Sequence, residues 1–391
     1  MRTVGTQAIG IRMPIIHEGD DLVSIVVDNI LNHCKQTNAP LKDRDIIGVT
    51  EAIVARAQGN YATFAQISKA VRNKIPSGAV GVVFPILSRN RFSALPGIAA
   101  GVDKLYIQLS YPSDEVGNHL VTIEKMYEAG VNPYTNTFDE AGFRKVFGDI
   151  KHEFTGIDYI ELYRILGNNA EIILANDPCE ILKYTKNIIA ADIHTREQTK
   201  RRLRENGAEI VIGFDDILTE SIDGSGYNNQ YGILGHNVSS EGRVKLFPHS
   251  CEKFVESVHK KIFEKTGVSV EVLVYGDGAF KDPVGKIWEL ADPVVGVAFT
   301  KGLNGLPNEL KLKYIADNKI DNKRGEEARE AIINQIREKD AILVGKDETL
   351  GTTPRHYSDL IGSLCDLVSG SGDKGTPVVL VTGYFDNYAS E

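Results

Sequence analysis

The stretch SLCDLVSGSGDKGTPVVLVTG, residues 363–383, places the end of an apolar helix, a glycine-rich loop and an apolar strand in immediate succession. The loop holds Gly370, Gly372 and Gly375 within six positions. Glycine adopts positive φ without steric cost, so the backbone N–H groups of such a loop can turn inward and bind an anion. A phosphate group fits a loop of this kind, and the stretch therefore predicts a phosphate-binding connection between a helix and a strand.

The order of residues in this loop differs from that of a Walker loop. In a Walker loop the lysine and the serine or threonine follow the last glycine and open a helix. Here Lys374 precedes Gly375, and Pro377 leads into the predicted strand at residues 378–381. The ordinary P-loop NTPase is therefore excluded. A helix C-cap followed by a tight helix-to-strand turn remains an open alternative to phosphate binding.

Composition indicates a globular protein with more than one domain. The chain has 391 residues, 42% hydrophobic and 25% charged, and this length favours two or three compact domains. A formal charge of −9 offers no basic surface for nucleic acid, so small molecules or proteins are the expected partners. The four cysteines form no CxxC pair, and neither a signal peptide nor a membrane span is evident, so we expect a cytoplasmic protein without membrane contact.

The middle of the chain has the pattern of a parallel sheet. Strands are predicted at residues 171–175, 187–192 and 209–213, and helices at residues 178–184 and 195–205. This alternation predicts right-handed crossovers and a sheet covered on both faces. No GxGxxG segment follows these strands, so a dinucleotide-binding domain is not predicted. Polar residues such as Asp192 and His194 follow the strands, where they either face a ligand or form caps and turns.

Asp277 lies between Gly276 and Gly278, just after a predicted strand at residues 268–275. A carboxylate in this place can hold a metal ion or a phosphate-linked cation, because glycine leaves room for the ligand. The same three residues also fit an ordinary turn, and their pattern leaves both interpretations open. Further along, residues 325–339 predict a charged helix and residues 341–344 a strand.

Six segments, taken in order, resemble the coenzyme F420-0:gamma-glutamyl ligase family. They are MPIIHEGDDL at 13–22, DIIGVTEAIVARAQGN at 45–60, YGILGHN at 231–237, YGDGAFKDP at 275–283, ADPVVGVA at 291–298 and DLIGSLCDLVSGSGDKGTPVVLVTG at 359–383. The resemblance covers residues 1–60 and 230–391. We therefore expect a mixed α+β and α/β fold, in which a ligase-like module of residues 1–75 and 227–391 is interrupted by an inserted parallel-sheet α/β domain of residues 76–226.

The resemblance implies a nucleotide site built from several segments. It assigns GTP or ATP binding to Met13, Pro14, Ile15, Ile16, Thr50, Glu51, Arg56, Asn237, Ser369, Gly370, Ser371, Gly372, Asp373, Lys374, Gly375 and Thr376. It also implies a bound Mg or Mn ion, for which Asp277 is the counterpart of a family carboxylate. Leu234 and Ser371 stand where the family has acidic residues. Charge in the transition state would then be met by Lys374, Lys281 or Arg56, so Asp277, Lys374 and Arg56 are the expected catalytic residues.

The implied reaction is formation of an amide bond driven by GTP or ATP. A carboxylate acceptor takes the γ-phosphate to give an acyl phosphate, and the amino group of L-glutamate or a similar amino acid displaces it. An acceptor related to coenzyme F420 and a folate-type poly-gamma-glutamyl acceptor both fit. An alternative from a different functional class is a non-catalytic nucleotide-binding protein that has lost its metal site. The residues Leu234 and Ser371, which replace acidic residues of the family, agree with this alternative. By the same resemblance we expect a homodimer.

Overall fold

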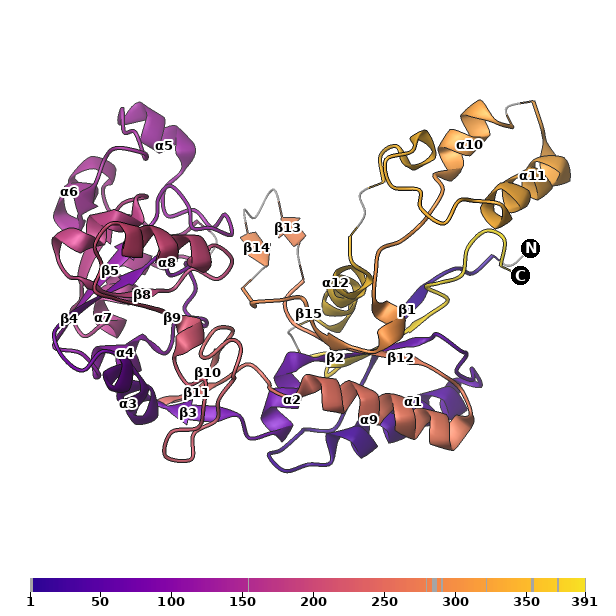
Figure 1. Ribbon diagram of the computed structural model, residues 1–391, viewed down its shortest axis with the longest axis horizontal. Helices are drawn as coiled ribbons and strands as arrows, with labels where there is room; N and C mark the ends of the chain where they lie inside the picture. Colours follow the sequence, from indigo (N-terminus) through magenta and orange to yellow (C-terminus); the bar gives the residue numbers. More distant parts are fainter. Residues whose placement is uncertain are drawn as a thin grey trace.

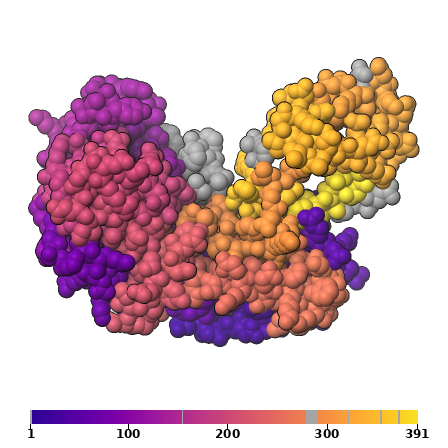
Figure 2. Space-filling model, in the orientation of Figure 1, coloured from indigo at the N-terminus to yellow at the C-terminus, as the bar shows by residue number. Residues whose placement is uncertain are grey.

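The computed structural model describes residues 3–153, 155–278, 280–282, 287–289, 291–320, 322–352, 355–370 and 373–390. Helices are mixed with sheets, some of them parallel, which confirms the predicted fold class. Figure 1 shows a sheet near both chain termini and a second sheet on the other side of the molecule. It also shows a small lobe that contains the helices of residues 312–318 and 325–337. Figure 2 shows a wide hollow between the second sheet and this lobe. Among the described residues, no helix combines the length and the apolar character needed to cross a membrane.

The first sheet, in the described part of the chain, has five strands in the order β1-β16-β2-β12-β15. Their bounds are β1 (Gln7–Ile11), β2 (Ile46–Thr50), β12 (Glu271–Tyr275), β15 (Gly296–Phe299) and β16 (Val378–Thr382). Strands β2 and β12 are parallel, whereas β16 runs antiparallel to β2. The carboxyl ends of β2 and β12 therefore meet the beginning of β16 at one edge of the sheet.

Helices cover both faces of this first sheet (Figure 1). They are α1 (Leu22–Thr37) and α9 (Cys251–Thr266) on one face and α12 (Tyr357–Ser369) on the other. Successive side chains of a strand point to opposite faces. Accordingly Ile47 packs in the core beneath α1 and α9, while Ile46 packs beneath α12. Gly48 permits the close approach of α12, because a Cβ there would lie 2.5 Å from the Cys365 sulfur.

The second sheet has the order β6-β7-β5-β4-β8-β9 in the described residues, and its strands are parallel except for β6. Their bounds are β4 (Ala79–Val83), β5 (Lys104–Leu109), β6 (Phe138–Asp139), β7 (Glu171–Leu174), β8 (Asn187–Ala190) and β9 (Ile210–Gly213). The chain runs outward from β4 to β7 and then returns to place β8 on the other side of β4. This is a doubly wound sheet whose strand order reverses between β4 and β8.

Helices surround this doubly wound unit. They are α3 (Phe64–Lys74), α4 (Leu95–Ala99), α5 (Ile123–Glu128), α6 (Glu140–Phe147), α7 (Tyr159–Leu166) and α8 (Arg196–Glu205), with 3₁₀ helices at Pro178–Lys183 and Phe214–Asp216. The unit's core also takes in Ile67 of α3 and, later in the chain, Leu234 and Leu246. The boundaries at residues 76 and 226 remain a prediction.

Smaller elements complete the described structure. A three-stranded sheet of order β10-β11-β3 links the two large sheets, and β13 pairs with β14. The bounds are β3 (Tyr61–Thr63), β10 (Asn237–Ser240), β11 (Arg243–Lys245), β13 (Phe280–Asp282), β14 (Ile287–Glu289), α10 (Leu312–Asn318) and α11 (Gly325–Arg337), with 3₁₀ helices at Lys301–Leu303 and Asp347–Thr349.

The strand predicted at residues 341–344 is wrong, because this segment forms a bend and a turn. Ile342 is 73% exposed and Val344 is 60% exposed, while Leu343 between them is buried. The four residues, Ala-Ile-Leu-Val, form a continuous apolar run, but no described strand pairs with the segment to form a ladder of hydrogen bonds. An isolated extended segment cannot satisfy its backbone groups as a strand.

An acidic loop of the chain itself fills the place where the strand order of the doubly wound sheet reverses. Ligands of such sheets bind outside the carboxyl ends of the strands at this point. Here Asp114 accepts a hydrogen bond of 2.8 Å from the Leu87 N–H, beyond β4. Glu115 accepts hydrogen bonds from the backbone N–H groups of residues 193–195, beyond β8. Carboxylates of the chain thus occupy donors that could otherwise bind a phosphate.

Substituting Glu115 with alanine should destabilise the doubly wound unit. The N–H groups of residues 193–195 would lose their shared acceptor and would donate hydrogen bonds to water instead. We expect the free energy of unfolding to fall by about 1–2 kcal/mol in urea titrations, the usual cost of losing such a cap. Glu128→Ala, at an exposed position that ends α5, is the control and should stay within about 0.5 kcal/mol of the parent. Equal losses in the two variants would contradict the role of Glu115.

Candidate functional site

A cavity of about 640 Å³ lies at the edge of the first sheet where β2 and β12 end and β16 begins. Eight of the predicted residues line it in the described part of the chain: Thr50, Glu51, Asn237, Asp277, Ser369, Gly370, Gly375 and Thr376. They come from the end of β2 and the start of α2 (Glu51–Ala57), from β10, from the segment after β12, and from the loop before β16. The strand pairing thus joins segments that lie far apart in the sequence.

The loop between α12 and β16 has the backbone that its glycines predict. Gly370 and Gly375 both adopt left-handed φ, of 61° and 67°. The Thr376 hydroxyl donates a hydrogen bond of 3.0 Å to the Ser369 carbonyl, which draws the two ends of the loop together. The Gly370 N–H also donates to the Asp366 carbonyl and closes the helix. The loop is therefore a helix cap and a cavity wall at the same time. Ser371 and Gly372 lie outside the described residues.

The remaining predicted residues of the described part of the chain are not among those that line the cavity. The Met13 N–H donates a 3.0 Å hydrogen bond to the Gly375 carbonyl, so the segment that continues through Pro14 runs beside the loop. Within this segment Ile15 is 75% exposed, whereas Ile16 is buried in the core under α1.

Three predicted charged residues are exposed. Arg56 lies in the last turn of α2, and Asp373 and Lys374 lie on the outer part of the loop. The Lys374 ammonium is nevertheless near the loop backbone, because a Cβ on Gly370 would lie 3.7 Å from it. Their roles toward a nucleotide stay predictions. The Lys281 side chain lies outside the described part of the structure.

A buried ion pair holds one wall of the cavity. Glu51 begins α2, and both of its carboxylate oxygens accept hydrogen bonds from the Lys245 ammonium, at 2.9 and 2.8 Å. The Asn237 amide donates to the same carboxylate at 3.5 Å. Both charged side chains are at most 10% exposed. Removing one partner would leave the other charge buried and uncompensated, so the pair fixes α2 against β11.

Asp277 is held by contacts from both large sheets. Its N–H donates to Asp292 at 2.8 Å, and its carboxylate Oδ2 accepts a 2.7 Å hydrogen bond from Arg91 Nη2. Arg91 lies in the loop between β4 and α4 of the doubly wound unit. Its Nη1 donates to the Gly235 carbonyl at 2.8 Å and lies 2.7 Å from Asp292 Oδ1. The cavity wall is thus assembled from both sheet units.

Burial and charge set the electrostatics around Asp277. Burial lowers the pKa of Arg91, but the carboxylates of Asp292 and Asp277 raise it above its usual value. Burial raises the pKa of Asp292 well above its usual value, and Arg91 opposes this shift. Asp366, which accepts a 2.9 Å hydrogen bond from the Gly278 N–H, has its pKa raised by burial and by the charge of Asp277.

Asp277 and Asp366 together suit a hard divalent cation that also binds phosphate. Both line the cavity, and the Asp277 side chain is 24% exposed. In the described residues, no group of three or more acidic, histidine or cysteine side chains is arranged to hold a metal ion by itself. Mg²⁺ commonly uses one or two carboxylates and completes its shell with water and phosphate oxygens, which agrees with this pair. Leu234 is buried in the core and offers no ligand.

His236 ties the segment before β10 to the loop between β4 and α4. It is fully buried, and its Nε2 accepts a 3.1 Å hydrogen bond from the Ala94 N–H. Its Nδ1 lies 2.7 Å from the Ile233 carbonyl and can donate to it. These contacts fit a neutral imidazole with its proton on Nδ1. Burial lowers the pKa of His236 to about 4, which agrees with that assignment.

Residues that sequence reasoning missed are Arg91, Lys245, Asp292 and Asp366. Asp292 and Asp366 lie inside segments that carry the family resemblance, so a search of those segments for carboxylates could have found them. Arg91 lies in the segment SRNRF, residues 88–92, which has no distinctive spacing. Its partners are more than a hundred residues away in the chain, and only the fold brings them together.

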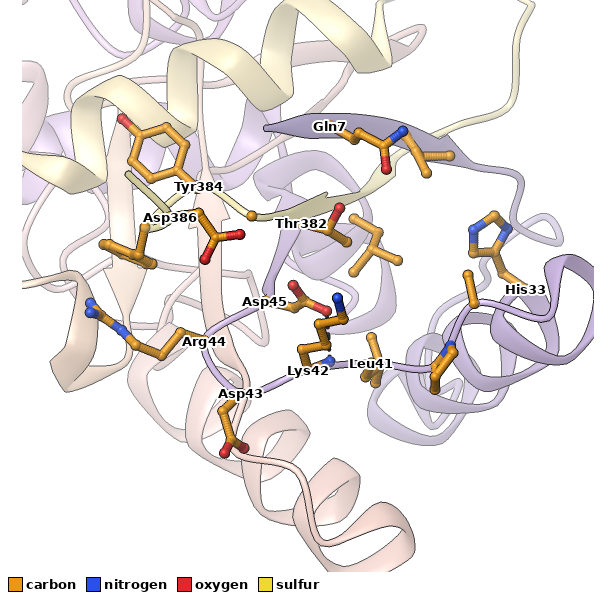
Figure 3. Close-up of a pocket in the computed structure, with 16 residues that line it drawn as sticks. Gln7, His33, Leu41, Lys42, Asp43, Arg44, Asp45, Thr382, Tyr384 and Asp386 are labelled. Carbon is orange, nitrogen blue, oxygen red and sulfur yellow. Dashed lines mark hydrogen bonds between the residues drawn. The ribbon is translucent and has the colours of Figure 1, made fainter. Parts of the chain in front are cut away.

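A second cavity, of about 440 Å³, lies at the opposite edge of the first sheet (Figure 3). Lys42, Asp43 and Asp45 line it from the loop before β2, and the Arg44 guanidinium lies 3.6 Å from the centre of the Phe385 ring. Burial raises the pKa of Asp45. The described residues around it include none of those predicted to bind nucleotide, so the cavity at Asp277 is the candidate site.

Comparison with known proteins gives one family. The model of the F420-0:Gamma-glutamyl ligase family matches residues 10–383. These bounds enclose the doubly wound unit as well as the two outer blocks that carry the resemblance. No curated protein matches the chain.

The buried His236 should make stability depend on pH. Its folded pKa of about 4 lies below the ordinary 6.5, so the unfolded chain binds more protons between these values. The contribution of neutral His236 is therefore complete above pH 6.5 and falls by about 3 kcal/mol as the pH drops toward 4. Urea unfolding of the parent and of His236→Leu at several pH values measures this difference.

The leucine variant lacks the titrating group, so its stability should change less than that of the parent across this window. His17→Leu, at an exposed position, is the control and should keep the pH dependence of the parent. Parallel pH profiles for the parent and His236→Leu would contradict the assignment.

Proposed function

We propose that this chain, which belongs to the F420-0:gamma-glutamyl ligase family, uses GTP or ATP to attach L-glutamate or a similar amino acid to a carboxylate acceptor. The family is one of ligases, so the chain is placed among enzymes. The nucleotide, the divalent ion and the acyl-phosphate intermediate are parts of the proposal. So is the expected homodimer.

The observation that carries the proposal is the convergence of predicted residues on one cavity. Thr50, Asn237, Asp277 and the glycine-rich loop lie far apart in the sequence and line the same wall. The cavity volume of about 640 Å³ lies within the range of roughly 300–1,000 Å³ that is usual for small-molecule sites. A loop with two left-handed glycines and the carboxylates of Asp277 and Asp366 all line this space. This combination supports binding of a nucleotide together with a cation.

Each group at the cavity has a part in the proposed phosphoryl transfer. The loop N–H groups and Lys374 would hold the phosphates, while the Thr50 hydroxyl and the Asn237 amide would orient the nucleotide. Asp277 and Asp366 would hold Mg²⁺ or Mn²⁺, which neutralises charge on the transferring phosphate when bound. Catalysis would then rest on positioning and on electrostatic stabilisation rather than on a covalent nucleophile.

The proposed chemistry has two steps. An oxygen of the acceptor carboxylate forms a bond to the γ-phosphorus, and the nucleoside diphosphate leaves. The amino nitrogen of glutamate then attacks the acyl carbon, inorganic phosphate leaves, and the nitrogen loses a proton to give the amide. The walls of the cavity would exclude water that could otherwise hydrolyse the acyl phosphate.

The second carboxylate at the cavity favours an enzyme over a nucleotide-binding protein that has lost its metal site. The sequence departures at Leu234 and Ser371 left Asp277 as the single expected ligand, and Asp366 now stands beside it at the same wall. A screen of phosphate release from GTP and ATP, with L-glutamate and with acceptors of the F420-0 and folate types, tests the proposal. If no phosphate is released with any combination of nucleotide and acceptor that the chain binds, the result contradicts ligase activity.

Substituting Gly375 with valine should weaken nucleotide binding. Gly375 has φ of 67°, where a β-branched residue is strained, so the loop would shift and its N–H groups would lose their alignment. We expect GTP or ATP affinity to fall at least tenfold in calorimetric titrations. Gly130→Val is a matched control, because Gly130 has φ of 65° and both positions have open space for a Cβ. Equal nucleotide affinity in the two variants would contradict the role of the loop.

Substituting Asp277 with asparagine should reduce turnover far more than nucleotide binding. The change removes a negative charge with little change in shape, while the loop N–H groups stay in place. We expect kcat to fall by about two orders of magnitude and nucleotide affinity by a few fold. Asp317→Asn, at an exposed position in α10, is the control and should keep the parent's rate. Metal-dependent turnover equal to the parent's in Asp277→Asn would place the cation elsewhere.

A further inference from the structure

We propose that Arg91, supplied by the doubly wound unit, is a positioning residue that holds the Asp277 carboxylate in place for the divalent cation. This inference rests on the proposed function. It assigns to the doubly wound unit a direct part in orienting a cation ligand that follows a strand of the first sheet.

The backbone around Asp277 does little to orient its side chain. Asp277 lies between two glycines, which contribute no side-chain packing and restrict the chain least. The N–H groups of Asp277 and Gly278 are fixed by Asp292 and Asp366. The side chain itself is bound at Oδ2 by Arg91 Nη2, at 2.7 Å. The direction of the carboxylate therefore depends on the guanidinium.

Arg91 is itself rigidly placed. It is 8% exposed, and its second terminal nitrogen is fixed by the Gly235 carbonyl at 2.8 Å and by Asp292 at 2.7 Å. A planar guanidinium can serve two acceptors in fixed directions, which the point charge of a lysine cannot do. One carboxylate oxygen of Asp277 is engaged, and a carboxylate has a second that can accept. In the described part of the chain, the contact with Arg91 engages Oδ2 of Asp277 and leaves Oδ1 for a cation.

The surrounding segments strengthen this placement. Asn90, next to Arg91, donates a 2.7 Å hydrogen bond to the Asn237 side chain and accepts one of 2.8 Å from the Val238 N–H. Asn90 thus fastens the loop after β4 to β10, and Arg91 fastens it to the segment before β10 and to the segment after β12. Partners that orient metal ligands are usually worth about 10–100-fold in metal affinity.

The experiment compares Mn²⁺ binding in the presence of GTP, followed by electron paramagnetic resonance, in the parent, Arg91→Lys and Arg91→Met. We expect Arg91→Met to weaken Mn²⁺ binding by about 10–100-fold, with a changed Mn²⁺ spectrum, and Arg91→Lys to recover part of the loss. GTP affinity without metal should change by less than about threefold, because other groups hold the phosphates. Arg144→Met is the control. Arg144 forms ion pairs within the doubly wound unit, with Glu140 and Asp158, and should leave Mn²⁺ binding unchanged.

A double variant separates positioning from a general structural role. If Arg91 acts through Asp277, then Arg91→Met combined with Asp277→Asn should bind Mn²⁺ no more weakly than Asp277→Asn alone. Additive losses, or parental Mn²⁺ binding in Arg91→Met, would overturn the inference and leave the proposed function standing. Should Arg91→Met fail to fold, Arg91→Met with Asp292→Asn removes the same contact without leaving Asp292 as an unpaired buried charge. A parent that binds no Mn²⁺ with GTP would count against both proposals.

Discussion

Parallel pairing of β2 with β12 is the constraint on which the candidate site depends. Thr50 lies opposite Tyr275 in this pair, and Val378 lies opposite Val49 on the other side of β2. The first residues of α2, the segment of Asp277 and the glycine-rich loop therefore emerge at one edge. Parallel strands also require a long crossover between them. The whole doubly wound unit lies within this crossover, which is why it can return a loop to the same edge.

Buried polar contacts join the parts of the molecule that meet at the cavity. Arg91, His236 and the Glu51–Lys245 pair are all buried. Arg91 links the doubly wound unit to the first sheet, the Glu51–Lys245 pair links α2 to β11, and His236 links the loop after β4 to the segment before β10. Such contacts contribute modest net stability, but they are costly when a partner is missing. They therefore select one relative arrangement of the units, and the width of the cavity follows from that arrangement.

Local patterns in the sequence predicted much of this edge. The helix, the glycines and the strand of residues 363–383 are contiguous, and the structure has them as α12, the left-handed Gly370 and Gly375, and β16. Residues 341–344 show the limit of local pattern, because a short apolar run forms a strand only where a neighbouring strand pairs with it. Arg91 shows the limit more sharply, since its role depends on partners from distant parts of the chain. A mixed α/β fold could be predicted from the sequence, but the positions of Arg91 and Lys245 at the cavity could not.

The acidic loop of Asp114 and Glu115 has a consequence for selectivity. A carboxylate tethered beside its donors acts at an effective concentration of about millimolar or more, set by the chain that holds it. Any free phosphate compound reaching the doubly wound unit would have to compete with this resident ligand for the N–H groups of residues 193–195. Glu115 thereby disfavours nucleotide binding at the point where the strand order of the doubly wound sheet reverses, which is where the topology would otherwise offer a binding site.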